Sequence, residues 1–190
     1  MSSNDNDKMK WRVLDSEYLI RRPWMTARRD RVQLPSGTIH PEYYILEYPD
    51  WVNVIAITAD GQFVMVKQYR HGLRDVFTEL CAGVMEEGET PLQAAKRELE
   101  EETGYVGGEW TLMMEISGNP SCTNNITHCF IARGVEPSGT RHLDATEDIK
   151  VELLSEDEIL GMLRRDEMKQ ALMLAPLWRY FAQRCLNTPE

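Results

Sequence analysis

The chain of 190 residues is 42% hydrophobic and 27% charged, which is typical of one globular domain, with or without a small appendage. Its formal net charge of -10 disfavours nucleic acid as a non-specific partner, because a polyanion is repelled by an acidic surface. The start MSSNDNDK has no apolar core, and no apolar run approaches the roughly 18 residues needed to span a bilayer. We therefore expect a cytoplasmic protein with no membrane partner and with free thiols at its cysteines.

Two hairpins are predicted in the first part of the chain. Residues 24–34 and 38–48 flank the turn signal PSG, and the runs WVNVIAIT and QFVMVKQY flank ADG. Further strands are predicted at TLMMEIS, ITHCFIARGV and EDIKVELLS. The tripeptide YPD near residue 48 separates the first hairpin from the rest, so residues 1–48 are predicted as an N-terminal segment and residues 49–190 as the main domain.

The first helix has well-defined ends. Thr90 is a typical N-cap, Pro91 occupies the first helical position, and Gln93 completes a capping box. Gly104 is a suitable left-handed terminator. The pattern therefore predicts a helix from Pro91 to about Gly104.

Two further helices are predicted towards the C-terminus. Ser155 and Glu158 form a second capping box, and residues 167–185 have the composition of a third helix that Pro176 should bend or break. Strands mixed with helices at both ends of the main domain indicate an α/β sandwich.

Seven glutamates lie between Glu86 and Glu102. Glu98, Glu101 and Glu102 are spaced three or four residues apart, so they share one face of the first helix. The apolar stripe beside them is predicted to consist of Leu92, Ala95 and Leu99. Clustered carboxylates without histidine suit a hard cation such as magnesium or manganese, although a Glu-rich helix face can also be merely solvated.

The spacing in this stretch resembles the signature of the Nudix hydrolases. It runs Gly83, five residues, Glu89, seven residues, Arg97-Glu98-Leu99, one residue, Glu101-Glu102, one residue, Gly104-Tyr105. The resemblance implies a Nudix-type α/β/α sandwich with a mixed β-sheet, here with a small N-terminal β-hairpin domain. It also implies hydrolysis of a nucleoside diphosphate linked to another group.

The same resemblance implies roles for individual positions. Arg97 would orient the glutamates through charge-assisted hydrogen bonds, and Glu89 would brace the loop. The implied ligands of Mg²⁺ or Mn²⁺ are Ala82, through its main-chain carbonyl, Glu98, Glu101 and Glu102.

Outside this stretch the chain is similar to the ADP-ribose pyrophosphatase branch of the family, from about Trp11 to the last helix. QYRHG precedes ELCAGVMEEGE, Pro120 lies fifteen residues after Tyr105, and Glu147 occupies the place of a loop glutamate that assists catalysis. Cys81 departs from the branch, which usually has proline there. The substrate-binding positions implied by this similarity are Trp24, Tyr44, Arg70, Glu79 and Pro120.

The expected activity is metal-dependent hydrolysis of ADP-ribose to AMP and ribose 5-phosphate. The expected enzyme is a homodimer that exchanges N-terminal hairpins, with aromatic rings of the hairpin stacked on adenine. GDP-sugars and other nucleoside diphosphates remain alternative substrates. A ligand-sensing Nudix domain without activity is the alternative from another class, although the glutamates of the signature are all present.

Overall fold

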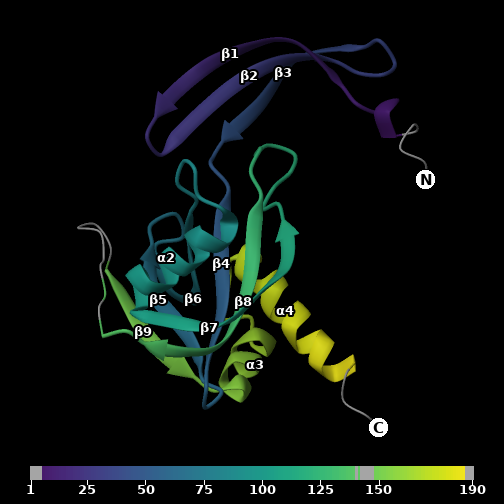
Figure 1. Cartoon of the computed structure of the whole chain (residues 1–190). Helices are drawn as coiled ribbons and strands as arrows, with labels where there is room; N and C mark the ends of the chain where they lie inside the picture. The colour runs from purple at the N-terminus through teal and green to yellow at the C-terminus, as the bar shows by residue number, and fades with distance from the viewer. Residues whose placement is uncertain (1–5, 140, 142–147, 187–190) are drawn as a thin grey trace. The chain divides into compact units, whose positions relative to one another are not determined.

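The computed structural model describes residues 6–139, 141 and 148–186 (Figure 1). The chain forms two compact units. One consists of Met1–Tyr48 with Asn119–Asn125, and the other of Pro49–Gly118 with Ile126–Glu190. No helix in the described ranges is long and apolar enough to cross a membrane.

The N-terminal unit is built on an antiparallel sheet with the order β1-β2-β3. Its strands are β1 (Arg12–Arg22), β2 (Met25–Gln33) and β3 (Ile39–Glu47). The turn between β2 and β3 contains Gly37 with a φ of 87°, a left-handed conformation that glycine adopts without steric cost. The predicted hairpin is therefore confirmed as β2 and β3.

Strand β1 was not predicted, so the expected hairpin domain is in fact a three-stranded sheet. The pairing of β1 with β2 shifts register between Val13 and Asp15 and again between Tyr18 and Ile20. These irregularities interrupt the alternation of polar and apolar residues by which a strand is recognised in a sequence.

The second unit contains a mixed sheet of six strands in the order β7-β8-β4-β6-β5-β9. Its strands are β4 (Trp51–Thr58), β5 (Phe63–Arg70), β6 (Asp75–Val84), β7 (Tyr105–Ile116), β8 (Thr127–Pro137) and β9 (Ile149–Leu154). Strands β4 and β8 are parallel, and the other pairs are antiparallel. The predicted second hairpin is confirmed as β4 and β5, but β6, which was not predicted, also pairs with both strands.

Alternate residues of the central strands feed two separate cores. Val52, Val54 and Cys81 pack in the core that includes helix α2 (Pro91–Thr103). Ile55 and Phe63 pack in the other core, which includes helices α3 (Glu156–Arg164) and α4 (Ala171–Leu186). A sheet between two helical layers is the predicted α/β/α sandwich, which is confirmed.

The helix ends follow the sequence closely. The Thr90 side chain caps α2 in a reciprocal capping box with Gln93, and Gly104 terminates the helix with a φ of 72°. Ser155 caps α3 in the same way with Glu158.

Helix α4 differs from the prediction, because it starts at Ala171 and continues through Pro176. Proline has no N–H to donate to the carbonyl of Leu172, four residues earlier. The buried side chain of Asn53 on β4 replaces that donor, with Nδ2 2.8 Å from the Leu172 carbonyl oxygen. A tertiary hydrogen bond therefore compensates for the missing bond in the helix, and it attaches α4 to the sheet.

Candidate active site

Residues 83–105, which carry the signature spacing, are called the box; β6 is the box strand, and residues 85–90 are the box loop. Strand β6 and helix α2 meet at Gly83. A Cβ added at this residue would overlap the carboxyl group of Glu98, so a larger residue here would force the Glu98 side chain to move. The carboxyl group of Glu98 therefore lies against the backbone of Gly83, which follows Ala82 in the chain. The glycine of the signature thus has a steric reason.

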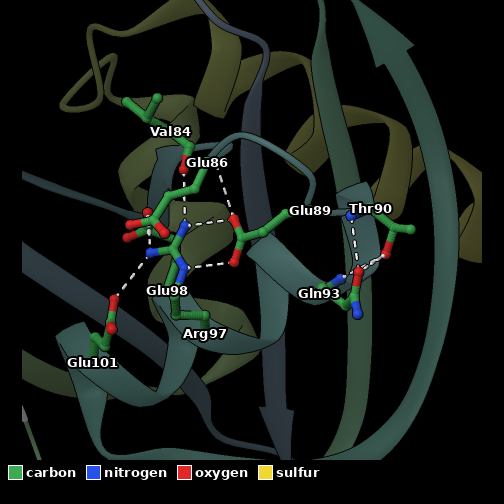
Figure 2. A network of polar contacts seen from close by, with 8 residues as sticks. All are labelled: Val84, Glu86, Glu89, Thr90, Gln93, Arg97, Glu98 and Glu101. Atoms are coloured by element: carbon green, nitrogen blue, oxygen red, sulfur yellow. Dashed lines mark hydrogen bonds and ion pairs between the residues drawn. The ribbon is translucent and has the colours of Figure 1, made fainter.

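Arg97 braces the loop between β6 and α2 (Figure 2). Its Nε and Nη2 atoms donate to the two oxygens of Glu89 at 2.8 and 2.9 Å, and Nη2 also donates to the Val84 carbonyl oxygen at 2.9 Å. The main-chain N–H of Glu86 donates to Glu89 at 3.0 Å. The Arg97 hydrogen bonds lower the pKa of Glu89 to about 2, and those with Glu89 raise the pKa of Arg97.

The three predicted metal-binding carboxylates differ in exposure. Nη1 of Arg97 donates to Glu98 at 2.9 Å and to Glu101 at 3.0 Å. Glu102 is buried, with an exposed fraction of 4%, and accepts a hydrogen bond of 3.2 Å from the N–H of Ala82. The three side chains therefore lie around one end of α2 but do not all face solvent.

The apolar stripe predicted for α2 needs a correction. Ala95 and Leu99 are buried as expected, but Leu92 is 38% exposed, and Ala94 takes its place in the core. The buried face of α2 therefore includes Glu102, whose carboxylate accepts the N–H of Ala82 on β6.

The donor set of this region fits a divalent metal by its chemistry. Carboxylate and carbonyl oxygens are the ligands that hard cations prefer. In the conformation described, however, Arg97 engages two of the carboxylates, and no group of three His, Cys, Asp or Glu side chains within the described residues is arranged as a metal site. The bonds to Arg97 involve one oxygen of each carboxylate, Oε1 of Glu98 and Oε2 of Glu101.

Cys81 adjoins this region from the side of the sheet. The thiol is fully buried, and burial, followed by the negative charge of Glu102, raises its pKa well above the ordinary value. Cys81 is therefore a protonated thiol at neutral pH and contributes no charge to the carboxylate cluster.

Arg70 and Glu79 form a second polar pair, on the neighbouring strands β5 and β6. Nε and Nη2 of Arg70 donate to one oxygen of Glu79 at 3.1 and 2.6 Å. The Glu79 side chain is 4% exposed, whereas that of Arg70 is 39% exposed. The guanidinium group of Arg70 thus binds a buried carboxylate through Nε and Nη2, while the arginine side chain remains partly exposed.

Of the remaining predicted residues, three belong to the N-terminal unit and one is not described. Trp24, with an exposed fraction of 84%, and Tyr44, with 51%, belong to the N-terminal unit. Pro120 is exposed and belongs to the same unit through the segment Asn119–Asn125. Glu147 lies outside the described residues.

One contributor to this region was missed by the sequence analysis. Nε of Arg141 donates at 2.5 Å to the main-chain oxygen of Glu102, and Arg141 also donates to the main-chain oxygen of Ile149. The bond to Glu102 spans 39 residues of chain, so no local spacing could have indicated it.

The fold and the box define the class of this protein, and comparison with known families agrees. Residues 48–175 match the NUDIX domain, and the chain belongs to this family of hydrolases, which generally use divalent metal ions. Residues 11–46 match a second family, described as the nucleoside diphosphate sugar hydrolase N-terminal domain.

Two curated relatives cover most of the chain. A protein of Bacillus methanolicus named methanol dehydrogenase activator is 36% identical over 71% of this chain and 73% of its own. A protein of Bacillus subtilis named ADP-ribose pyrophosphatase is 34% identical over 74% of this chain and 76% of its own. A crystal structure described as an ADP compounds hydrolase superposes with a TM-score of 0.81 over 94% of this chain and 97% of that one, and at 20% identity it supports the fold alone.

Proposed function

We propose that the protein hydrolyses ADP-ribose to AMP and ribose 5-phosphate. The observation that carries the proposal is the Arg97-braced box, in which Gly83, Glu89 and the glutamates of α2 meet at one point of the fold. The choice of substrate is supported by the match of residues 11–46 to an N-terminal domain of nucleoside diphosphate sugar hydrolases. It is also supported by the name of the Bacillus subtilis relative.

The metal in this proposal is Mg²⁺ or Mn²⁺, held by Glu98, Glu101, Glu102 and the carbonyl of Ala82. When bound, such a cation neutralises charge on the diphosphate and acidifies water. The hydrogen bonds of Arg97 to Glu98 and Glu101 keep the two carboxylates near the end of β6 before the cation arrives.

The protein's own groups then handle the substrate and the proton. Glu147 accepts a proton from the attacking water, whose oxygen forms a new bond to phosphorus while the P–O bond within the diphosphate breaks. Arg70, which forms an ion pair with the buried Glu79, contacts a phosphate oxygen through the exposed part of its side chain. Pro120 lines the substrate pocket in this proposal.

Base recognition is assigned to the N-terminal unit. The exposed ring of Trp24 offers a face on which adenine can stack, and Tyr44 offers a second. We further propose that two chains form a homodimer by exchanging their N-terminal sheets, which would cover the free strand edges of this unit. Light scattering would report a particle of about twice 22.0 kDa.

A cytoplasmic location is also part of the proposal. All four cysteines are free thiols, as expected in a reducing compartment.

The decisive experiment is product analysis by chromatography. ADP-ribose incubated with the protein and Mg²⁺ should yield AMP and ribose 5-phosphate in equal amounts, and a chelator should abolish the reaction. GDP-mannose, diadenosine polyphosphates and NADH, tested in parallel, would rank the alternative substrates. Tight binding of ADP-ribose without any turnover would instead indicate a sensor domain and would overturn the proposal.

A further inference from the structure

A row of three ionisable side chains crosses the sheet at the end where the box loop leaves it. Glu115 near the end of β7 is the register partner of His128 on β8, and Asp50 immediately precedes β4, which pairs with β8 on its other side. His128 is buried, whereas the side chains of Asp50 and Glu115 are 43% and 55% exposed. The row is separate from the carboxylates of α2.

The imidazole of His128 lies between the two carboxylates. Nε2 is 3.5 Å from Oδ2 of Asp50, and Nδ1 is 2.8 Å from Oε1 of Glu115, although the latter pair is not aligned as a hydrogen bond. Within the described residues, these two carboxylates are the ionisable groups in ion-pair distance of the ring. A protonated imidazole can donate to both carboxylates, whereas a neutral one can donate only once.

Asp50 is also the point at which two loops are attached. Its main-chain oxygen accepts the N–H of Met85, the first residue after the box strand, at 2.9 Å. Its Oδ1 accepts the N–H of Ile126 at 2.8 Å. Ile126 is the residue at which the chain returns towards β8 after the segment that contains Pro120.

We propose that Asp50, His128 and Glu115 form a positioning element for the hydrolysis, which sets Ile126 relative to the start of the box loop at Met85. This inference rests on the proposed function. Asp50 holds both loop ends, through its main-chain oxygen at Met85 and through Oδ1 at Ile126. The imidazole of His128 lies beside the other carboxylate oxygen, Oδ2, at 3.5 Å. The three residues are distinct from the carboxylates of α2 that are proposed to hold the metal, so we expect their effect to be on the fit of the substrate.

The first test separates substrate fit from chemistry. Asp50→Ala removes the acceptor for Ile126 and should raise KM for ADP-ribose about tenfold while kcat changes less than about threefold, since substrate fit affects ground and transition states alike. Asp50→Asn keeps an oxygen for the Ile126 N–H and should recover much of the loss. Glu109→Gln, on an exposed residue of β7 outside the row, is the matched control and should behave as wild type.

The second test asks whether His128 acts through Asp50. His128→Gln alone should raise KM for ADP-ribose, whereas adding it to Asp50→Ala should raise KM no further, because the ring then has no Asp50 carboxylate beside it. Glu109→Gln should leave KM unchanged in both backgrounds. A wild-type KM in Asp50→Ala with only a lowered melting temperature, or additive effects of His128→Gln and Asp50→Ala on KM, would overturn the inference.

A failure of the proposed function can be told apart from a failure of this inference. If wild type releases no AMP, the proposed substrate is wrong, and amide exchange at Ile126 then tests the anchor without any turnover. Faster exchange in Asp50→Ala than in wild type would support the anchor, and equal exchange would exclude it.

Discussion

Replacing Glu89 by glutamine should destabilise the folded protein measurably, because Glu89 is the main partner of Arg97. The carboxylate accepts two hydrogen bonds from the guanidinium group and one from the N–H of Glu86. Glutamine keeps one acceptor oxygen but turns an NH₂ group towards a guanidinium that can only donate. The brace between the box loop and α2 would therefore lose at least one charge-assisted bond.

The size of the effect follows from the pKa of Glu89. The hydrogen bonds of Arg97 lower this pKa from its ordinary 4.5 to about 2, and at about 1.36 kcal/mol per pH unit this sets a ceiling of about 3 kcal/mol. The side chain is 19% exposed, so solvent screening and the remaining acceptor of glutamine reduce the expected loss to about 1–2 kcal/mol. A loss of this size lowers the melting temperature by about 2–8 °C in a chain of this length.

The effect should depend on pH with a definite sign. The pKa is lower in the folded state, so the stabilisation is fully present above about pH 4.5 and is lost as the pH falls towards about 2. Denaturant unfolding of both proteins without metal, followed by circular dichroism from about pH 7 to about pH 3, should show the difference narrowing at the acidic end. Glu87→Gln, on an exposed residue of the same loop, is the control and should match wild type.

Equal unfolding free energies for Glu89→Gln and wild type at about pH 7 would contradict this account of the brace. A difference that stays constant down to about pH 3 would mean that the loss comes from packing and not from the charge of Glu89.

Four further outcomes are expected. Glu102→Gln should keep the circular dichroism spectrum but lower kcat by about 10³-fold or more at saturating Mg²⁺, and near-normal turnover would remove Glu102 from the metal site. Glu147→Gln should lower kcat by roughly 10²–10⁴-fold with little change in KM, whereas a silent effect would move the base to another residue. Trp24→Ala should raise KM for ADP-ribose by an amount equivalent to about 1–3 kcal/mol, and an unchanged KM would exclude stacking on adenine. Asn53→Ala should destabilise the fold by about 1–3 kcal/mol in chemical denaturation, because the carbonyl of Leu172 is then buried without its donor; stability equal to wild type would argue that water satisfies that carbonyl.

Local patterns in the sequence were sufficient for the elements whose signals lie within a few residues of one another. The capping boxes at Thr90 and Ser155 and the terminator at Gly104 were confirmed because a cap involves only its own turn of helix. The spacing of Glu98, Glu101 and Glu102 likewise follows from the helical period alone. The helix and the shared face of its glutamates were therefore predictable before any tertiary contact was known.

Tertiary structure decided the features that depend on distant partners. Strand β6 was missed because its polar residues, such as Glu79, obscure the alternation expected of a strand, although pairing with β4 and β5 makes it part of the centre of the sheet. The exposure of Leu92 and the burial of Glu102 depend on the rotation of α2 about its own axis against the sheet. A helical period does not specify that rotation.

The same limit applies to single bonds between elements. Helix α4 continues through Pro176 because Asn53, 119 residues from Leu172, supplies the missing donor. The row of Asp50, His128 and Glu115 exists only because three strands bring those residues side by side. The periodicity of a sequence indicates which face of its own helix or strand a residue occupies. The residue that it contacts on a neighbouring element depends on the packing of the whole chain.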